Sequence, residues 1–132
     1  MSIVYDIIAW ALTIPLAMTF WKAGNFKRSA PIETMVAAGM GWTGDAPKGI
    51  VRLVGWLEVL GVVGLILAHI GGYVPGFAWS NIVAVLAAGG LSLTMLVAAL
   101  LHIVRGEIKY TWKMNFGFAA LAALAMVALI LK

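Results

Sequence analysis

Two titratable side chains inside long apolar segments are the best placed to do chemistry in this chain of 132 residues. Glu58 lies within an apolar run at about 51–70, and His102 lies near the end of another at 77–104. A carboxylate at the centre of a membrane helix costs roughly 2.5 to 3.5 kcal/mol, so it needs a partner or a task. We predict a polar pocket in which Glu58 carries a proton or anchors a ligand, with His102 as its hydrogen-bond partner. The alternative is a buried carboxyl group that only specifies how the helices pack.

Other small and polar residues are candidates for the same pocket. Gly55 precedes Glu58 by three residues and therefore shares its face of a helix. Arg52 is six residues away from Glu58, about 240° round a helix of 3.6 residues per turn, so the partner of Glu58 must come from another helix. Besides His102, the candidate partners on neighbouring helices are Thr13 and Asn115, and Gly24 lies on the same helix face as Thr13.

Asp6 and His69 form a second candidate site at the opposite end of the bundle. Asp6 lies near the start of the first apolar run and His69 near the end of the second, so both side chains are expected at the outer surface, where they can pair. Because water is available at a helix end, we expect both to be exposed and without function. His69 and His102 then lie on opposite sides of the membrane and cannot share a metal ion. The sequence has no cysteine and no metal-ligand spacing, so neither a metal site nor a resident cofactor is predicted.

The composition indicates the environment of these residues. Apolar residues make up 64% of the chain and charged residues 11%, and the mean hydropathy is +1.04. Soluble domains are nearer half apolar and a quarter charged, so neither a water-soluble globule nor a disordered chain is expected. A membrane helix needs about 20 apolar residues. Four such runs occur, at about 3–21, 51–70, 77–104 and 112–131. We predict an all-α protein whose single domain is a transmembrane four-helix bundle.

The loops between these runs predict the orientation of the bundle. Basic residues gather between the first and second runs and between the third and fourth, whereas the turn at 71–76 has none. The positive-inside rule therefore places both basic loops in the cytoplasm and both termini outside. In the long first loop, Pro31 and Gly39 bracket a helix of about two turns, which we expect in the membrane interface. A re-entrant hairpin at 29–42 is the alternative.

Three stretches of the chain resemble the DoxX-like family of small bacterial membrane proteins. Residues 23–27 read AGNFK, similar to the family's Ala-Gly-x-x-Lys segment, and residues 55–58 read GWLE, which resembles its Gly-x-x-Glu pattern. Residues 102–107, HIVRGE, supply the third, and the resemblance extends over about 9–125. It implies a four-helix protein of the bacterial cytoplasmic (inner) membrane and association with membrane redox complexes. It assigns no role to the matching positions, which are Gly24, Lys27, Gly55, Glu58, His102 and Glu107.

Three functions are compatible with these patterns. We favour a non-catalytic membrane component that binds a partner protein, a second copy of the chain, or a lipid such as a quinone between its helices. A membrane subunit associated with an oxidoreductase is a variant of this hypothesis. The second is a small proton-coupled transporter that uses Glu58, and the third is an enzyme with Glu58 and His102 as acid and base. The net charge of +4 is attributed to contacts with anionic lipid headgroups, and no nucleic acid is expected as a partner.

Overall fold

Six helices make up the computed structural model, which describes residues 2–132. Four of them are long and apolar enough to cross a membrane. The helices are α1 Ser2–Ser29, α2 Ile32–Ala37, α3 Trp42–Asp45, α4 Lys48–Gly71, α5 Ser80–Val104 and α6 Ile108–Leu131. The prediction of an all-α transmembrane four-helix bundle is confirmed, and the chain is a multi-pass membrane protein.

Three of the long helices extend beyond the apolar runs that predict them. α1 continues to Ser29, and its last turn carries Lys27 and Arg28, whose positive charges suit the negative end of a helix dipole. α4 begins directly after Pro47, a residue that favours a helix start because its fixed φ is already helical. Hydropathy alone does not detect these polar turns, since they lie where the bundle meets water.

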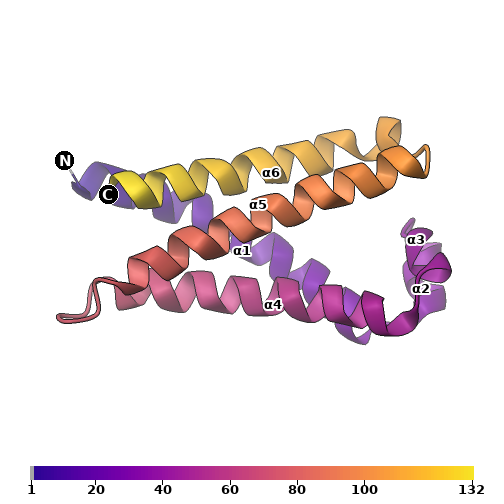
Figure 1. The fold of residues 1–132 in the computed structure, drawn as a ribbon, viewed down its shortest axis with the longest axis horizontal. Helices are drawn as coiled ribbons and strands as arrows, with labels where there is room; N and C mark the ends of the chain where they lie inside the picture. The colour runs from indigo at the N-terminus through magenta and orange to yellow at the C-terminus, as the bar shows by residue number, and fades with distance from the viewer. Residues whose placement is uncertain (1) are drawn as a thin grey trace.

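The four long helices form a ring. α1 packs against α4 and α6, and α5 packs against the same two helices. Figure 1 shows that α4 and α5 meet at the turn that joins them and diverge toward the other end of the bundle. We call the end with both chain termini and this turn the terminal end. The opposite end, where α1 and α5 finish and α4 and α6 begin, is the basic end.

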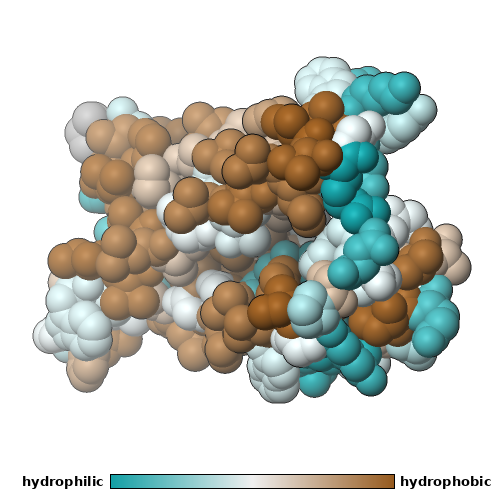
Figure 2. Space-filling view, turned by 45° about the vertical axis from the view of Figure 1, so that its right-hand side comes forward, coloured by the Kyte–Doolittle hydropathy of each residue, from teal (hydrophilic) through white to brown (hydrophobic). Residues whose placement is uncertain are grey.

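Small residues hold the helices together, and large apolar residues face outward. The buried small side chains of α5 and α6 include Ala84, Ala88, Ala119, Ala122 and Ala125. Leu67 of α4 and Leu86 of α5, in contrast, expose 63% and 68% of their surface. The hydrophobic colour of the outer face in Figure 2 shows the same arrangement. Close backbone approach through small residues is how membrane helices associate, because lipid is as apolar as leucine.

The segment between α1 and α4, residues 31–46, forms a cap at the basic end (Figure 1). The short helix predicted there is present as α2, with Pro31 before it and Gly39 after it at a φ of 96°, which favours glycine. α3 was not predicted, since a helix of four residues leaves no periodic pattern. The main contacts of α2 are with α3 rather than with the long helices. This cap segment therefore covers the end of the bundle and does not insert between its helices.

Candidate functional site

Two glycines bring α1 and α4 into backbone contact near the basic end. A Cβ added to Gly55 would lie 2.5 Å from the backbone nitrogen of Arg28 and 2.7 Å from the carbonyl oxygen of Gly24. A Cβ on Gly24 would lie 3.0 Å from the carbonyl oxygen of Gly55. Both positions therefore require glycine, because a side chain on either would push the two helices apart.

This crossing places Lys27 opposite Glu58. Lys27 follows Gly24 by three residues and Glu58 follows Gly55 by three, so each side chain lies one turn beyond the contact and on the same face as its glycine. The Lys27 Nζ atom donates to both carboxylate oxygens of Glu58 at 2.9 Å. The side chain of Glu58 is 2% exposed and that of Lys27 11%. The carboxylate is thus neutralised inside the bundle by a cation from the neighbouring helix.

Arg52 completes the end of α1 next to this pair. Its Nη1 atom donates to the carbonyl oxygens of Lys27 and Ala30, at 3.0 Å and 2.6 Å. The carbonyl of Lys27 is one of the last four of α1, which lack a partner within the helix, and Ala30 directly follows the helix. As the helical period predicts, Arg52 does not pair with Glu58.

A cavity of about 840 Å³ opens beside the ion pair. All four long helices and the cap segment contribute to its walls, and Trp42 and Met40 of the cap segment close it at the basic end. Ile50 of α4 and Leu93 and Val97 of α5 line the cavity and yet expose 50%, 61% and 59% of their surface. The mouth therefore lies between the diverging α4 and α5, on the apolar flank of the bundle. Figure 2 shows this hollow, with hydrophilic atoms at its floor.

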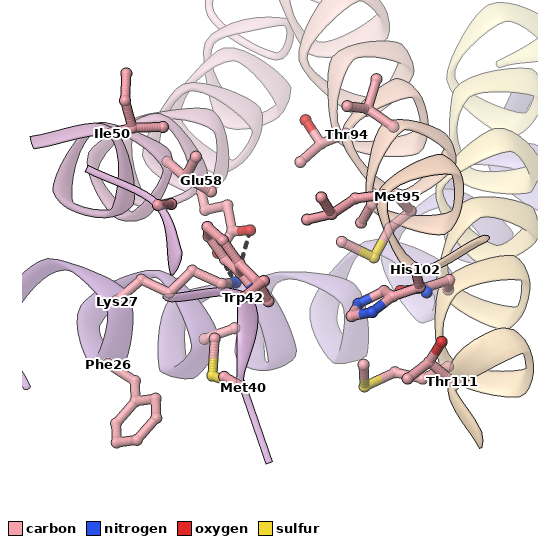
Figure 3. Close-up of a pocket in the computed structure, with 18 of the residues that line it drawn as sticks. Phe26, Lys27, Met40, Trp42, Ile50, Glu58, Thr94, Met95, His102 and Thr111 are labelled. Carbon is pink, nitrogen blue, oxygen red and sulfur yellow. Dashed lines mark hydrogen bonds and ion pairs between the residues drawn. The ribbon is translucent and has the colours of Figure 1, made fainter. Parts of the chain in front are cut away.

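His102 forms the opposite wall of the cavity. Figure 3 shows its ring pointing from α5 into the cavity, across from Glu58 and Lys27. Its Nδ1 atom lies 2.8 Å from Oε2 of Glu107, in the turn between α5 and α6. The other carboxylate oxygen of Glu107 accepts from Arg105 Nε at 2.9 Å, and Arg105 also donates to Asp45 of the cap segment at 2.6 Å. One chain of polar contacts thus connects the cap segment to the cavity.

Glu107 is held in its charged form by these contacts. The hydrogen bond from His102 and, after it, the one from Arg105 lower the pKa of Glu107 below its ordinary value. Conversely, the hydrogen bonds to Asp45 and Glu107 raise the pKa of Arg105. Both groups lie in the turn outside the membrane-spanning helices, where water reaches them.

The predicted pocket residues separate into two groups. Glu58, His102 and Asn115 all line the cavity, and Asn115 is 1% exposed with an amide nitrogen that has no partner within residues 2–132. Thr13 is fully buried elsewhere, fourteen residues before Lys27 and so about 21 Å away along α1. The expectation that Thr13 reaches Glu58 is therefore wrong. Thr13 shares a helix face with Gly24 but lies about three turns before it, far from the level of Glu58.

The predicted hydrogen bond between Glu58 and His102 is also wrong. Among the described residues each has another partner, Lys27 and Glu107 respectively. In the sequence, Lys27 is one of the basic residues between the first two apolar runs and a position of the family pattern, and neither fact pairs it with Glu58. The equal spacing of Gly24 to Lys27 and of Gly55 to Glu58 was the signal that identifies the pair.

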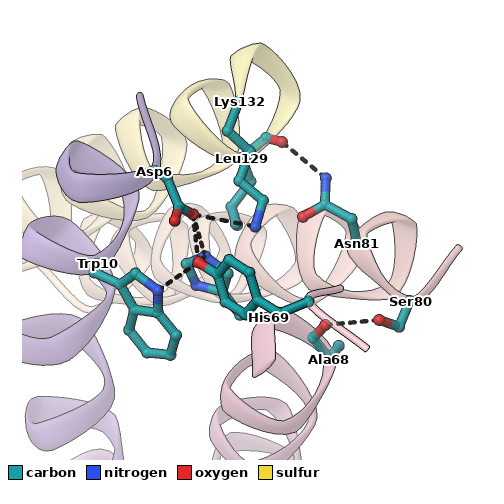
Figure 4. A network of polar contacts seen from close by, with 9 residues as sticks. Asp6, Trp10, Ala68, His69, Ser80, Asn81, Leu129 and Lys132 are labelled. Carbon is teal, nitrogen blue, oxygen red and sulfur yellow. Dashed lines mark hydrogen bonds and ion pairs between the residues drawn. The ribbon is translucent and has the colours of Figure 1, made fainter. Parts of the chain in front are cut away.

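At the terminal end, Asp6 and His69 form the predicted pair within a larger network (Figure 4). His69 Nε2 lies 3.3 Å from Asp6 Oδ1, which also accepts from the hydroxyl of Tyr73 and from Lys132 Nζ. The indole of Trp10 stacks on the imidazole of His69 with ring centroids 4.0 Å apart. His69 is fully buried, so the expectation of an exposed histidine is wrong. The indole of Trp10 covers the imidazole and shields it from water. The sequence alone does not predict this stacking.

Comparison with known proteins bears on the basic end of the bundle. The model of the DoxX-like family matches residues 11–125. The chain belongs to the DoxX-like family. The match takes in the glycine crossing, the ion pair and the His102–Glu107 contact of this DoxX-like protein, and the resemblance inferred from the sequence is confirmed. No curated protein and no solved structure matches the chain.

Proposed function

We propose that this DoxX-like protein binds a lipid-soluble amphiphile, such as a quinone or another lipid, in the cavity at the basic end. The observation that supports this proposal is the cavity itself: about 840 Å³ in volume, with its mouth on the apolar flank and polar side chains on two facing walls. Pockets for small organic ligands have volumes of about 300 to 1,000 Å³ and combine apolar walls with a few polar groups. The cavity meets both criteria.

The two parts of an amphiphile have separate places in this cavity. A polar head between the Lys27–Glu58 pair and His102 finds hydrogen-bonding groups on both sides. An apolar tail leaving between α4 and α5 passes Ile50, Leu93 and Val97, which already face lipid. Such a ligand enters from the bilayer without crossing water, and its head is shielded at the basic end by the cap segment.

The proposed setting is the bacterial cytoplasmic membrane, with the basic end toward the cytoplasm and both termini outside. Arg105, Lys109 and Lys113 lie in and after the turn between α5 and α6, and the adjoining ends of α1 and α4 carry Lys27, Arg28, Lys48 and Arg52. The positive-inside rule favours the cytoplasm for an end of the bundle with such an excess of basic residues. The cavity then opens in the cytoplasmic half of the bilayer.

Native mass spectrometry on protein extracted in mild detergent tests the proposal. Ala98→Phe adds a ring to a residue that lines the cavity, and Ala120→Phe adds the same ring to an exposed residue of α6 outside it. We expect the wild-type chain and Ala120→Phe to retain one lipid-soluble molecule per chain and Ala98→Phe to lose most of it. Bare protein in all three samples, or equal retention in all three, contradicts the proposal.

A further inference from the structure

The chemistry of the ligand head follows from how His102 is held. Its Nδ1 atom faces Oε2 of Glu107 at 2.8 Å, while the Nε2 atom has no hydrogen bond within residues 2–132 and is not among the fully buried atoms. Since the ring lines the cavity, Nε2 is the ring nitrogen that a ligand can reach.

Glu107 determines which ring nitrogen carries the proton. Its Oε1 atom is engaged by Arg105, whose guanidinium can only donate, and an ionised carboxylate can only accept. The hydrogen bond to His102 therefore requires a proton on Nδ1. In neutral imidazole the other nitrogen is then an acceptor. Because Glu107 acts through His102 and does not line the cavity, it is a positioning residue.

We propose that His102 presents Nε2 to the cavity as a hydrogen-bond acceptor and that the bound amphiphile has an uncharged head with a hydroxyl group. This inference rests on the proposed binding function and narrows its ligand to one chemical class, which includes quinols, alkylphenols and acylglycerols. The carbonyl groups of an oxidised quinone cannot donate a hydrogen bond to Nε2, because such a quinone has no hydroxyl group.

The charges around the cavity support an uncharged head. Among residues 2–132, Lys27 and Glu58 are the only Lys, Arg, Asp or Glu side chains that line it, and they pair at 2.9 Å. An anionic headgroup must displace Glu58 from Lys27 and leave a carboxylate unpaired in an apolar site, which is costly. A neutral hydroxyl group makes its hydrogen bond without disturbing the pair.

The tautomer of His102 is directly measurable. The chain has only two histidines, so nitrogen NMR of protein labelled in the histidine rings gives two sets of signals, and those missing from His102→Gln belong to His102. We expect a protonated Nδ1 and an unprotonated Nε2 in the wild-type protein. In Glu107→Gln, the amide oxygen stays with Arg105 and the amide nitrogen turns to His102. Since that nitrogen donates, it requires an unprotonated Nδ1, and we expect the proton on Nε2.

Binding of a matched pair of probes tests the ligand class. An alkylphenol and its methyl ether have the same ring and tail and differ in one hydroxyl proton. We expect the wild-type protein to bind the phenol about three- to tenfold more tightly, the value of one hydrogen bond. In Glu107→Gln this preference disappears, because a protonated Nε2 donates equally well to either oxygen. Tyr110→Phe, an exposed change in the same region, keeps the preference.

The outcomes separate this inference from the binding function. Equal affinity for phenol and ether in the wild-type protein, or a proton on Nε2, overturns the hydroxyl class and leaves amphiphile binding intact. Failure of both probes to bind, together with bare protein in the mass spectrum, overturns both. A fatty alcohol of the same chain length distinguishes an aliphatic from an aromatic hydroxyl: weaker binding than the phenol indicates a phenolic head.

Discussion

The ion pair between Lys27 and Glu58 is expected to stabilise the bundle through mutual neutralisation, and a double-mutant cycle measures this. Removing one partner of a buried pair costs about 3 to 5 kcal/mol, because the remaining charge has no counter-ion in an apolar site. Lys27 is 11% exposed near the end of α1, and its long stem can carry the ammonium toward water. We therefore expect the lower value, about 3 kcal/mol, for Glu58→Gln and for Lys27→Met.

The double variant is decisive because it leaves no unpaired charge. We expect Lys27→Met with Glu58→Gln to cost about 4 kcal/mol in total, which gives a coupling energy of about 2 kcal/mol. The free energy of unfolding is measured in mixed micelles with increasing sodium dodecyl sulfate and followed by helical circular dichroism. Lys22→Met, an exposed change on the same helix, is the control and should shift the free energy by less than about 0.5 kcal/mol. Single effects that simply add, within about 0.5 kcal/mol, refute the pairing.

Three further predictions concern the helix crossing, the terminal end and the orientation. Gly55→Ala should destabilise the bundle in the same assay, because its Cβ meets the backbone of α1, whereas Gly64→Ala, with nothing within 4 Å, should be neutral or stabilising; equal effects contradict the crossing. Burial and then the hydrogen bond to Asp6 raise the pKa of Tyr73, so the folded protein favours the protonated hydroxyl. The contribution of this hydroxyl to the free energy of unfolding is fully present below the ordinary tyrosine pKa of about 10 and declines as the pH rises above it. Tyr73→Phe should remove the most alkaline step of a tyrosinate absorbance titration, and a step that persists shows that another tyrosine causes it. Because the chain has no cysteine, a membrane-impermeant maleimide added to intact cells should label Val74→Cys and spare Lys109→Cys, and the reverse pattern contradicts the proposed topology.

The sequence predicts the membrane architecture because hydropathy and helix length are local properties. Four apolar runs separated by basic loops and a turn allow few other arrangements in a bilayer, where every backbone polar group must find a partner within a helix or a closed barrel. The helix ends are less predictable, since polar turns such as 22–29 remain helical beyond the apolar run. α3 is too short to leave any pattern.

The candidate site is only partly predictable because its geometry depends on contacts between helices. Glu58 is identifiable as buried and in need of a partner from another helix, and Asn115 and His102 as neighbours of the same cavity. The identity of the partner depends on where α1 crosses α4. The contact between Gly24 and Gly55 determines that crossing point, and Lys27 and Glu58 each follow one of these glycines by three residues. His102 pairs instead with Glu107, five residues later, because the turn after α5 folds that carboxylate back onto the ring.

A crystal structure with a ring-brominated alkylphenol tests most directly whether the cavity holds the head of a lipid-soluble ligand. Anomalous scattering locates the bromine independently of any interpretation of the surrounding density. We expect one strong peak inside the cavity, between Lys27 and His102, with the tail leaving past Leu93. A bromine peak only on the outer surface of the helices, or a cavity filled by side chains that leave no room for a ring, contradicts the binding function.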